Sequence, residues 1–348
     1  MSINRRIVSA DILRVISIFL VVILHVSGVI WTIIDVNSLN WSVINIYNSL
    51  ARCCVQIFIM LSGMFFLNPN KSITLKNIYT KYLPRIIIAL LFWSSIYLIR
   101  TPLNIESIKY IIISILKGNT NYHLWFLYMI IGLYIVTPIL RILTSNSTKR
   151  QIEYFLLIGI IISVIIPTLS NYFPFNFILE NINKMYIFIP KAYVVYYLLG
   201  FYLTNYELKK SIRILIYFLG SSGAIFTVII TQYLSIKNST PTDSWQGIFS
   251  INLMMYSIAV FLFLKNYFDN ITFSNRNIMF ISVLSSCSFG AYLIHDLFIK
   301  YFIKIGFLSL NTKAPIILVP IISFGIFICS MFLSYLIKKI PILNKFII

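Results

Sequence analysis

Two polar residues, Arg14 and His25, lie in the first apolar stretch. Their side chains can bind an anion and accept a proton, and their spacing places them on one face of a helix. A charged or titratable side chain is costly inside a membrane helix, so such residues mark functional sites by default. Eleven residues at 100° each are three turns plus about 20°, which puts both side chains on one helix face. They lie roughly 16 Å apart along the axis. One face thus combines a fixed positive charge at one end with a base toward the other.

The composition predicts a polytopic membrane protein. Of the 348 residues, 59% are hydrophobic and 11% are charged, whereas soluble domains carry about 25% charged residues. The net charge of +19 is interpreted as a topology signal and not as a nucleic-acid-binding surface, because lysine and arginine gather on the cytoplasmic side of membrane proteins.

The chain is predicted to be an all-α membrane protein with about ten transmembrane helices and one short interfacial or re-entrant helix at 105–117. Apolar stretches near 20 residues long are typical of spans. They lie at 11–31, 48–67, 84–100, 124–143, 153–172, 185–204, 212–234, 247–264, 278–300 and 314–337.

With the N-terminus inside, most of the 28 lysine and arginine residues fall on the cytoplasmic side. We therefore predict that both termini of this multi-pass membrane protein are cytoplasmic. No polar stretch is long enough to fold alone, so residues 1–348 are predicted to form a single transmembrane domain.

This topology places the three histidines, His25, His123 and His295, at one level in the outer half of the membrane. Histidine is the usual general base near neutral pH. For His123 and His295, hydrogen bonding between packed helices is an open alternative to a role in substrate binding.

A cationic cluster is predicted at the cytoplasmic level of Arg14, formed by Lys76, Lys81 and Arg85 at the start of the third span. Such a cluster suits phosphate groups, although ordinary positive-inside charge explains Lys76 and Lys81 equally well. Asp11, three residues before Arg14, is predicted to pair with it, either to lower the cost of burying the arginine or to orient it toward a ligand.

Other polar and aromatic residues have structural interpretations. Ser62 and Gly63 predict a close helix–helix approach, and Trp125 an interfacial anchor. The four cysteines have no metal-ligand spacing, and we expect them to pack in the core.

Four ordered motifs resemble the membrane acyltransferase-3 family. They are ADILRVISIFLVVILHVSG (10–28), NSLARCCVQIFIMLSGMFFL (48–67), YHLWFLYMIIGLYIVTPIL (122–140) and SFGAYLIHDLFI (288–299). The third motif is most similar to the branch of bacterial inner-membrane O-acetyltransferases that includes the enzyme modifying enterobacterial common antigen.

The resemblance implies a ten-helix fold, an acyl-CoA donor, usually acetyl-CoA, reached from the cytoplasm, and a hydroxyl acceptor on a surface polysaccharide or lipid-linked glycan. It implies that His25 is catalytic and that Arg14 belongs to the family's Arg-x10-His signature. The family's Arg-x-x-Arg motif is incomplete here, because Arg85 fills its second position while Tyr82 stands at the first. Lys81 is the candidate substitute for the missing charge.

We expect Arg14, Arg85 and Lys81 to bind the phosphates of acetyl-CoA and His25 to act as general base, with no metal. Asp11, Ser62, His123, Trp125 and His295 are the candidates for substrate binding or structural support. Direct transfer and a covalent acyl-histidine both stay open. A polysaccharide exporter is the alternative class, since membrane-embedded charges suit transport too, and a scaffold for glycan enzymes is a third.

Overall fold

A computed structural model describes residues 7–99, 105–172, 176–185, 192–307 and 313–341, together with 343 and 347. Helices are the regular secondary structure of these residues, which contain no strands, as predicted. The α-helices are α1 (Val8–Trp31), α2 (Leu39–Ala51), α3 (Cys54–Phe66), α4 (Leu75–Asn77), α5 (Leu83–Leu98), α6 (Ile105–Leu116), α7 (Trp125–Asn146), α8 (Lys149–Ile160), α9 (Ile166–Tyr172), α10 (Asn176–Lys184), α11 (Tyr193–Asn205), α12 (Lys210–Asn238), α13 (Ile251–Asp269), α14 (Asn275–Lys304) and α15 (Pro315–Lys338). Short π or 3₁₀ turns cover η1 (Ile78–Tyr82), η2 (Tyr122–Leu124) and η3 (Ile161–Ile165).

Nine helical segments among the described residues are long and apolar enough to cross a membrane, and they match nine of the ten predicted spans. The exception is the span predicted at 185–204. Its described part, α11, has 13 residues, or about 20 Å of helix, against roughly 30 Å for a hydrocarbon core. Residues 186–191 of that prediction lie outside the described residues.

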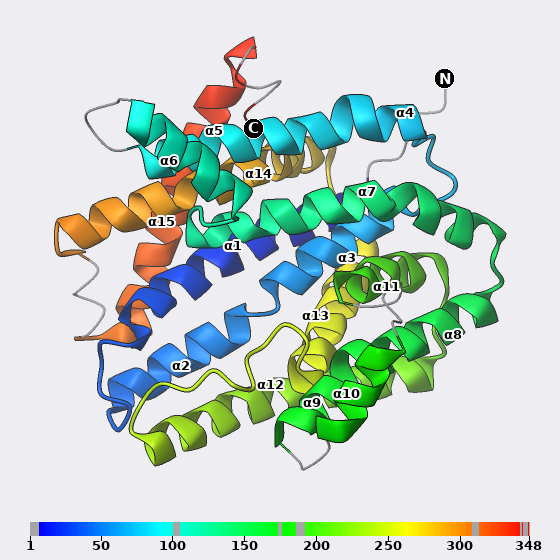
Figure 1. The fold of residues 1–348 in the computed structure, drawn as a ribbon, viewed down its shortest axis with the longest axis horizontal. Coiled ribbons are helices and arrows are strands. Elements are labelled where there is room, and N and C mark those ends of the chain that lie inside the picture. The colour runs from blue at the N-terminus through cyan, green and yellow to red at the C-terminus, as the bar shows by residue number, and fades with distance from the viewer. Residues whose placement is uncertain are drawn as a thin grey trace.

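The short segment predicted at 105–117 forms a separate helix, α6. It has 12 residues, only two of which are buried, Ile111 and Ser114. Figure 1 shows α6 at one edge of the bundle, beside the end of α5. Its length and exposure fit the predicted interfacial helix.

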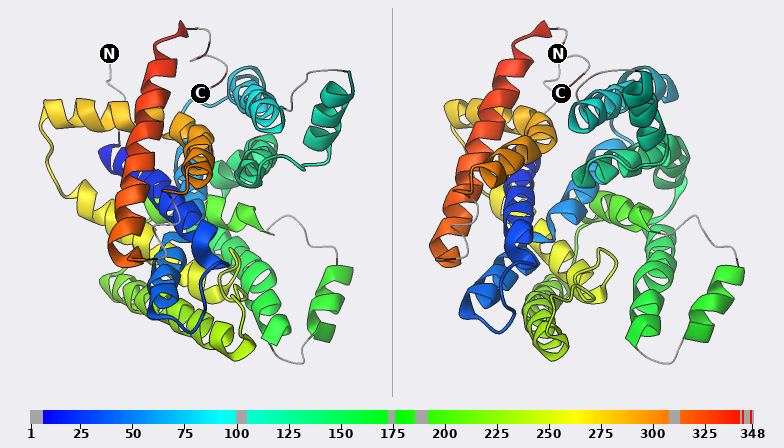
Figure 2. Two further views of the ribbon diagram at one scale, coloured as in Figure 1. Left: turned by 90° about the vertical axis from the view of Figure 1, so that its left-hand side faces the viewer. Right: turned by 60° about the vertical axis from the view of Figure 1, so that its left-hand side comes forward.

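Helix α1 forms the centre of the bundle. It contacts α14, α2, α15, α3 and α13, and both figures show it in the interior (Figures 1 and 2). Its polar residues are therefore surrounded by protein, which is how charged groups persist inside a membrane protein.

The second span is broken in its middle. Helix α2 ends at Ala51, α3 begins at Cys54, and the two run on in nearly one direction (Figure 1). Arg52 lies at the break and donates from Nε to Asn48 Oδ1 at 3.1 Å. A cation is favourable at the C-terminal end of a helix, so Arg52 stabilises the end of α2.

The third span begins with a π turn, η1, whose cause is Pro84. Proline has no N–H to donate to the carbonyl four residues earlier. Its ring also crowds that carbonyl, and the preceding residue, Leu83, donates to Ile78, five residues back. Such turns are frequent at functional sites, and this one immediately precedes Arg85.

Helices α3 and α11 pack through reciprocal glycines. A Cβ at Gly63 would lie 1.7 Å from the Tyr197 carbonyl oxygen, and one at Gly200 would lie 1.8 Å from that of Met60. The close approach predicted from Ser62-Gly63 is confirmed. Small residues allow this contact where the lipid offers no hydrophobic driving force between helices.

We predict that Gly200→Ala destabilises the protein, because the new methyl group overlaps the Met60 carbonyl and the helices must separate. Overpacking of this kind costs about 1–3 kcal/mol, occasionally more. Thermal unfolding in detergent checks it. The control is Gly132→Ala in α7, where a Cβ meets nothing within 4 Å and the midpoint should hold or rise. Equal midpoints for the two variants would contradict the prediction.

Candidate functional site

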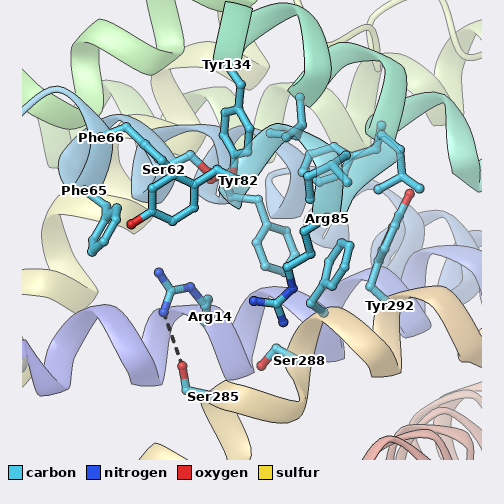
Figure 3. Close-up of a pocket in the computed structure, with 16 residues that line it drawn as sticks. Arg14, Ser62, Phe65, Phe66, Tyr82, Arg85, Tyr134, Ser285, Ser288 and Tyr292 are labelled. Atoms are coloured by element: carbon cyan, nitrogen blue, oxygen red, sulfur yellow. Dashed lines mark hydrogen bonds between the residues drawn. The ribbon is translucent and has the colours of Figure 1, made fainter. Parts of the chain in front are cut away.

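Arg14 and Arg85 line one cavity of about 310 Å³, in line with the expectation of a cationic cluster. Figure 3 shows their guanidinium groups entering the same space from α1 and α5, with Ser285 and Ser288 of α14 beside them. The rest of the wall is largely aromatic and includes Tyr82 and Tyr134 from η1 and α7. Two guanidinium groups with nearby hydroxyls can bind the oxygens of a phosphate group.

Asp11 pairs with Arg14 as predicted. Arg14 Nη1 lies 3.3 Å from Asp11 Oδ1, which also accepts a hydrogen bond from the Ser285 hydroxyl at 2.6 Å. Because α1 and α14 both contribute, the pair holds the guanidinium at the helix interface. The Asp11 carboxylate is 5% exposed, so the contact compensates a buried charge as well as orienting the arginine.

A second cavity of about 520 Å³ adjoins the first, with which it shares Arg14, Phe65 and Tyr82. Lys71, in the loop after α3, lines it and places its Nζ 3.7 Å from the centre of the Phe65 ring. Burial and the nearby Arg14 guanidinium lower the pKa of Lys71. In the predicted topology, Lys71 is only one of the basic residues on the cytoplasmic side.

The loop that carries Lys71 is held by Arg141 of α7. The Arg141 guanidinium donates to the backbone carbonyls of Phe66, Asn68 and Lys71 at 2.7, 3.0 and 2.8 Å. These bonds satisfy carbonyls at the end of α3. Arg141 therefore fixes the wall of the second cavity.

Lys81 does not lie in the cavity with Arg14 and Arg85. It is exposed on η1, lines neither cavity among the described residues, and places its Nζ 5.6 Å from the centre of the Tyr82 ring. Tyr82, which stands at the first position of the incomplete Arg-x-x-Arg motif, lines both cavities instead.

The three histidines lie together at the other end of α1, which agrees with the prediction that they share one level in the membrane. His25 Nδ1 lies 2.7 Å from His295 Nε2, and the His123 ring centre is 5.0 Å from that of His295 and 6.4 Å from that of His25. All three come from different spans, so the cluster forms only in the folded protein.

The hydrogen bonds determine the tautomers of the neutral pair. His295 Nδ1 lies 2.6 Å from the Tyr292 carbonyl oxygen, which can only accept. His295 therefore carries its proton on Nδ1, and its Nε2 accepts from His25 Nδ1–H. This leaves a lone pair on His25 Nε2, the form that a general base requires.

Sequence reasoning did not identify Asp296, which follows His295 on α14. Its carboxylate accepts hydrogen bonds from Asn121 and from the Tyr122 hydroxyl, the latter at 2.7 Å, and pairs with Lys300 at 3.2 Å. Tyr122 in turn packs edge-on against the His25 ring, with centres 4.9 Å apart. The carboxylate thus positions the tyrosine that borders His25. The signal in the sequence that could have indicated Asp296 is the His-Asp dipeptide at 295–296.

Tyr292 lies one helical turn before His295 on α14 and contacts two of the three histidines. Its hydroxyl donates to the His123 carbonyl, while its own carbonyl orients His295. Its ring also lines the arginine cavity, together with Phe58 and Phe126. The same three rings line a small cavity at His25, so they form the wall between the two ends of the site.

The remaining candidates border these cavities. Ser62 lines the arginine cavity and donates to the Phe58 carbonyl at 2.9 Å. Trp125 lines the small cavity at His25 and packs against Tyr193, with ring centres 6.0 Å apart. Both are placed as support for the site.

The fold and the site together define the class of protein. It is an all-α polytopic membrane protein with a cationic cavity at one end of α1 and a histidine cluster at the other. The chain belongs to the acyltransferase-3 family, whose model, described as an acyltransferase domain, matches residues 7–337. It is thus a membrane acyltransferase by family. Comparisons with curated proteins and with solved structures gave no match.

The tautomer assignment predicts a specific ¹⁵N spectrum, which three histidines make readable. In ¹⁵N-histidine-labelled protein at neutral pH, His25 should be protonated on Nδ1 and bare on Nε2, because His295 can only accept from it. His295→Leu should release this constraint and change the His25 signals, while His123→Leu should leave the His25 tautomer in place. A His25 ring protonated on Nε2 in the unmodified protein would overturn the assignment.

Proposed function

We propose that the protein is an O-acetyltransferase that moves an acetyl group from acetyl-CoA to a hydroxyl of a cell-surface polysaccharide or lipid-linked glycan, with His25 as general base. The observation that carries the proposal is the lone pair left on His25 Nε2 by its bond to His295, at the far end of a helix whose other end holds Arg14. The family membership supports acyl transfer as the reaction.

The charges favour a donor bound from the N-terminal end of α1. Coenzyme A carries phosphates at one end and its thioester at the end of a long pantetheine arm. Arg14 and Arg85 suit the phosphates, and the adjoining cavity adds Lys71. The arm then leads along α1 toward His25, past the wall of three rings.

The reaction at His25 balances without a further reactant. The acceptor oxygen bonds to the acyl carbon as the carbon–sulfur bond breaks. The hydroxyl proton passes to His25 Nε2 and then to the leaving sulfur, which yields an ester and free coenzyme A. Through His295, the Tyr292 carbonyl stabilises the imidazolium that forms in between, in the manner of an orienting group in a catalytic triad.

The proposed orientation has the N-terminal end of α1 and both termini in the cytoplasm, and the protein in the inner membrane. The positive-inside bias supports it. The donor then comes from the cytoplasm, and the acceptor reaches the histidine cluster from the outer side. This arrangement agrees with the resemblance to the O-acetyltransferases of bacterial surface glycans.

We predict that His25→Ala lowers acetyl transfer by roughly 10²–10⁴-fold, the usual contribution of a positioned general base. The measurement is label transfer from radioactive acetyl-CoA to glycan in membrane vesicles, together with the mass of the surface glycan with and without the protein. Size-exclusion profiles in detergent control for folding. Normal transfer by a well-folded His25→Ala variant would exclude this residue as the base.

We also predict that the KM for acetyl-CoA rises at alkaline pH, and at a lower pH than an ordinary lysine would cause, because Lys71, whose pKa is lowered, loses its proton sooner. The neutral amine no longer attracts the phosphates, which stay ionised in this range since their second pKa is about 6. Lys71→Arg should flatten the rise, as arginine stays charged. Lys76→Arg, at an exposed position outside both cavities, serves as control, and identical pH profiles for the Lys71→Arg variant and the unmodified protein would refute the role of Lys71.

A further inference from the structure

The small cavity at His25 has a size that suits one chemical group. Its volume is about 30 Å³, and its wall includes Val21 of α1, Cys54 and Val55 of α3, and His123. On the same measure the arginine cavity has about 310 Å³, so the cavity at His25 suits a short group such as acetyl better than a long acyl chain.

The apolar part of the wall comes from α1 and α3. Val21 is 3% exposed and Cys54 is fully buried, so neither has room to move aside. Interiors this closely packed respond to a change of one methylene. The wall therefore discriminates by length.

The polar part of the wall is the His123 ring, which carries one N–H donor when it is neutral. His123 is 2% exposed, and neither of its ring nitrogens has a hydrogen-bond partner among the described residues. Buried polar groups without partners are rare in folded proteins. The absence of such a partner therefore indicates that this ring binds a ligand with an acceptor atom. The oxygen of an acyl carbonyl is such an acceptor, and it becomes negative as the hydroxyl attacks.

We propose that this cavity is the acyl pocket, in which Val21 and Val55 limit the acyl chain to two carbons while His123 faces the carbonyl oxygen. The assignment rests on the proposed function.

The test compares two adjacent valines of α1. Val21 lines the cavity, whereas Val22, 0% exposed, lines none of the described cavities. Membrane vesicles from cells that make the glycan receive radioactive acetyl-CoA or propionyl-CoA, and the label in the glycan is counted. The ratio of propionyl to acetyl transfer is independent of the amount of protein.

Val21→Ala should raise that ratio roughly tenfold or more, the usual effect of one methylene in an apolar pocket, and Val22→Ala should leave it unchanged. Val55→Ala gives the same readout from α3 if Val21→Ala folds poorly. His123→Leu should lower transfer from both donors, by roughly 10²–10³-fold if it removes an oxyanion donor.

An unchanged ratio in both Val21→Ala and Val55→Ala, with acetyl transfer intact, would overturn the acyl pocket and leave the proposed function standing. Equal shifts in Val21→Ala and Val22→Ala would also overturn it, because the effect would then be general loosening of the core. Absence of transfer from either donor by the unmodified protein would instead contradict the proposed function.

Discussion

The register between α1 and α14 is the constraint on which the site depends. Arg14 reaches Ser285 at 3.4 Å, and His25 reaches His295 at 2.7 Å. Both partner numbers rise together, so the helices run parallel, and eleven residues of α1 match ten of α14. At 1.5 Å per residue the two intervals differ by only about 1.5 Å. One helix pair thus sets both the cationic end and the histidine end of the site.

Sliding one helix by a turn would break both ends together. A turn is about 5.4 Å, well beyond hydrogen-bond length, and it would leave Asp11 and His295 buried without these partners. Uncompensated polar groups in the interior are costly. The polar contacts therefore fix the register of α1 against α14. Buried polar residues are well known to fix helix register in coiled coils.

The sequence predicted which polar residues are buried in the membrane region better than it predicted the residues that they contact. Arg14, His25, Asp11 and the level of the histidines follow from spacing within a helix and from apolar length. The His25–His295 bond, the Tyr292 carbonyl and the roles of Ser285 and Asp296 depend on which helices are neighbours and in what register, and no periodicity within one span carries that information. The same limit applies to α11, whose length as an apolar stretch does not reveal that its glycine packs against the α3 backbone.

The separation between the two ends also matters for the proposed chemistry. At an effective dielectric constant of 20, two positive charges roughly 16 Å apart repel by about 1 kcal/mol, against about 4 kcal/mol at 4 Å. In the proposed reaction, Arg14 would therefore attract the donor without strongly opposing an imidazolium at His25. The wall of Phe58, Phe126 and Tyr292 lies between the arginine cavity and the cavity at His25. A long, thin donor arm is the kind of ligand that connects two such places, and a site divided in this way selects for it through shape as well as charge.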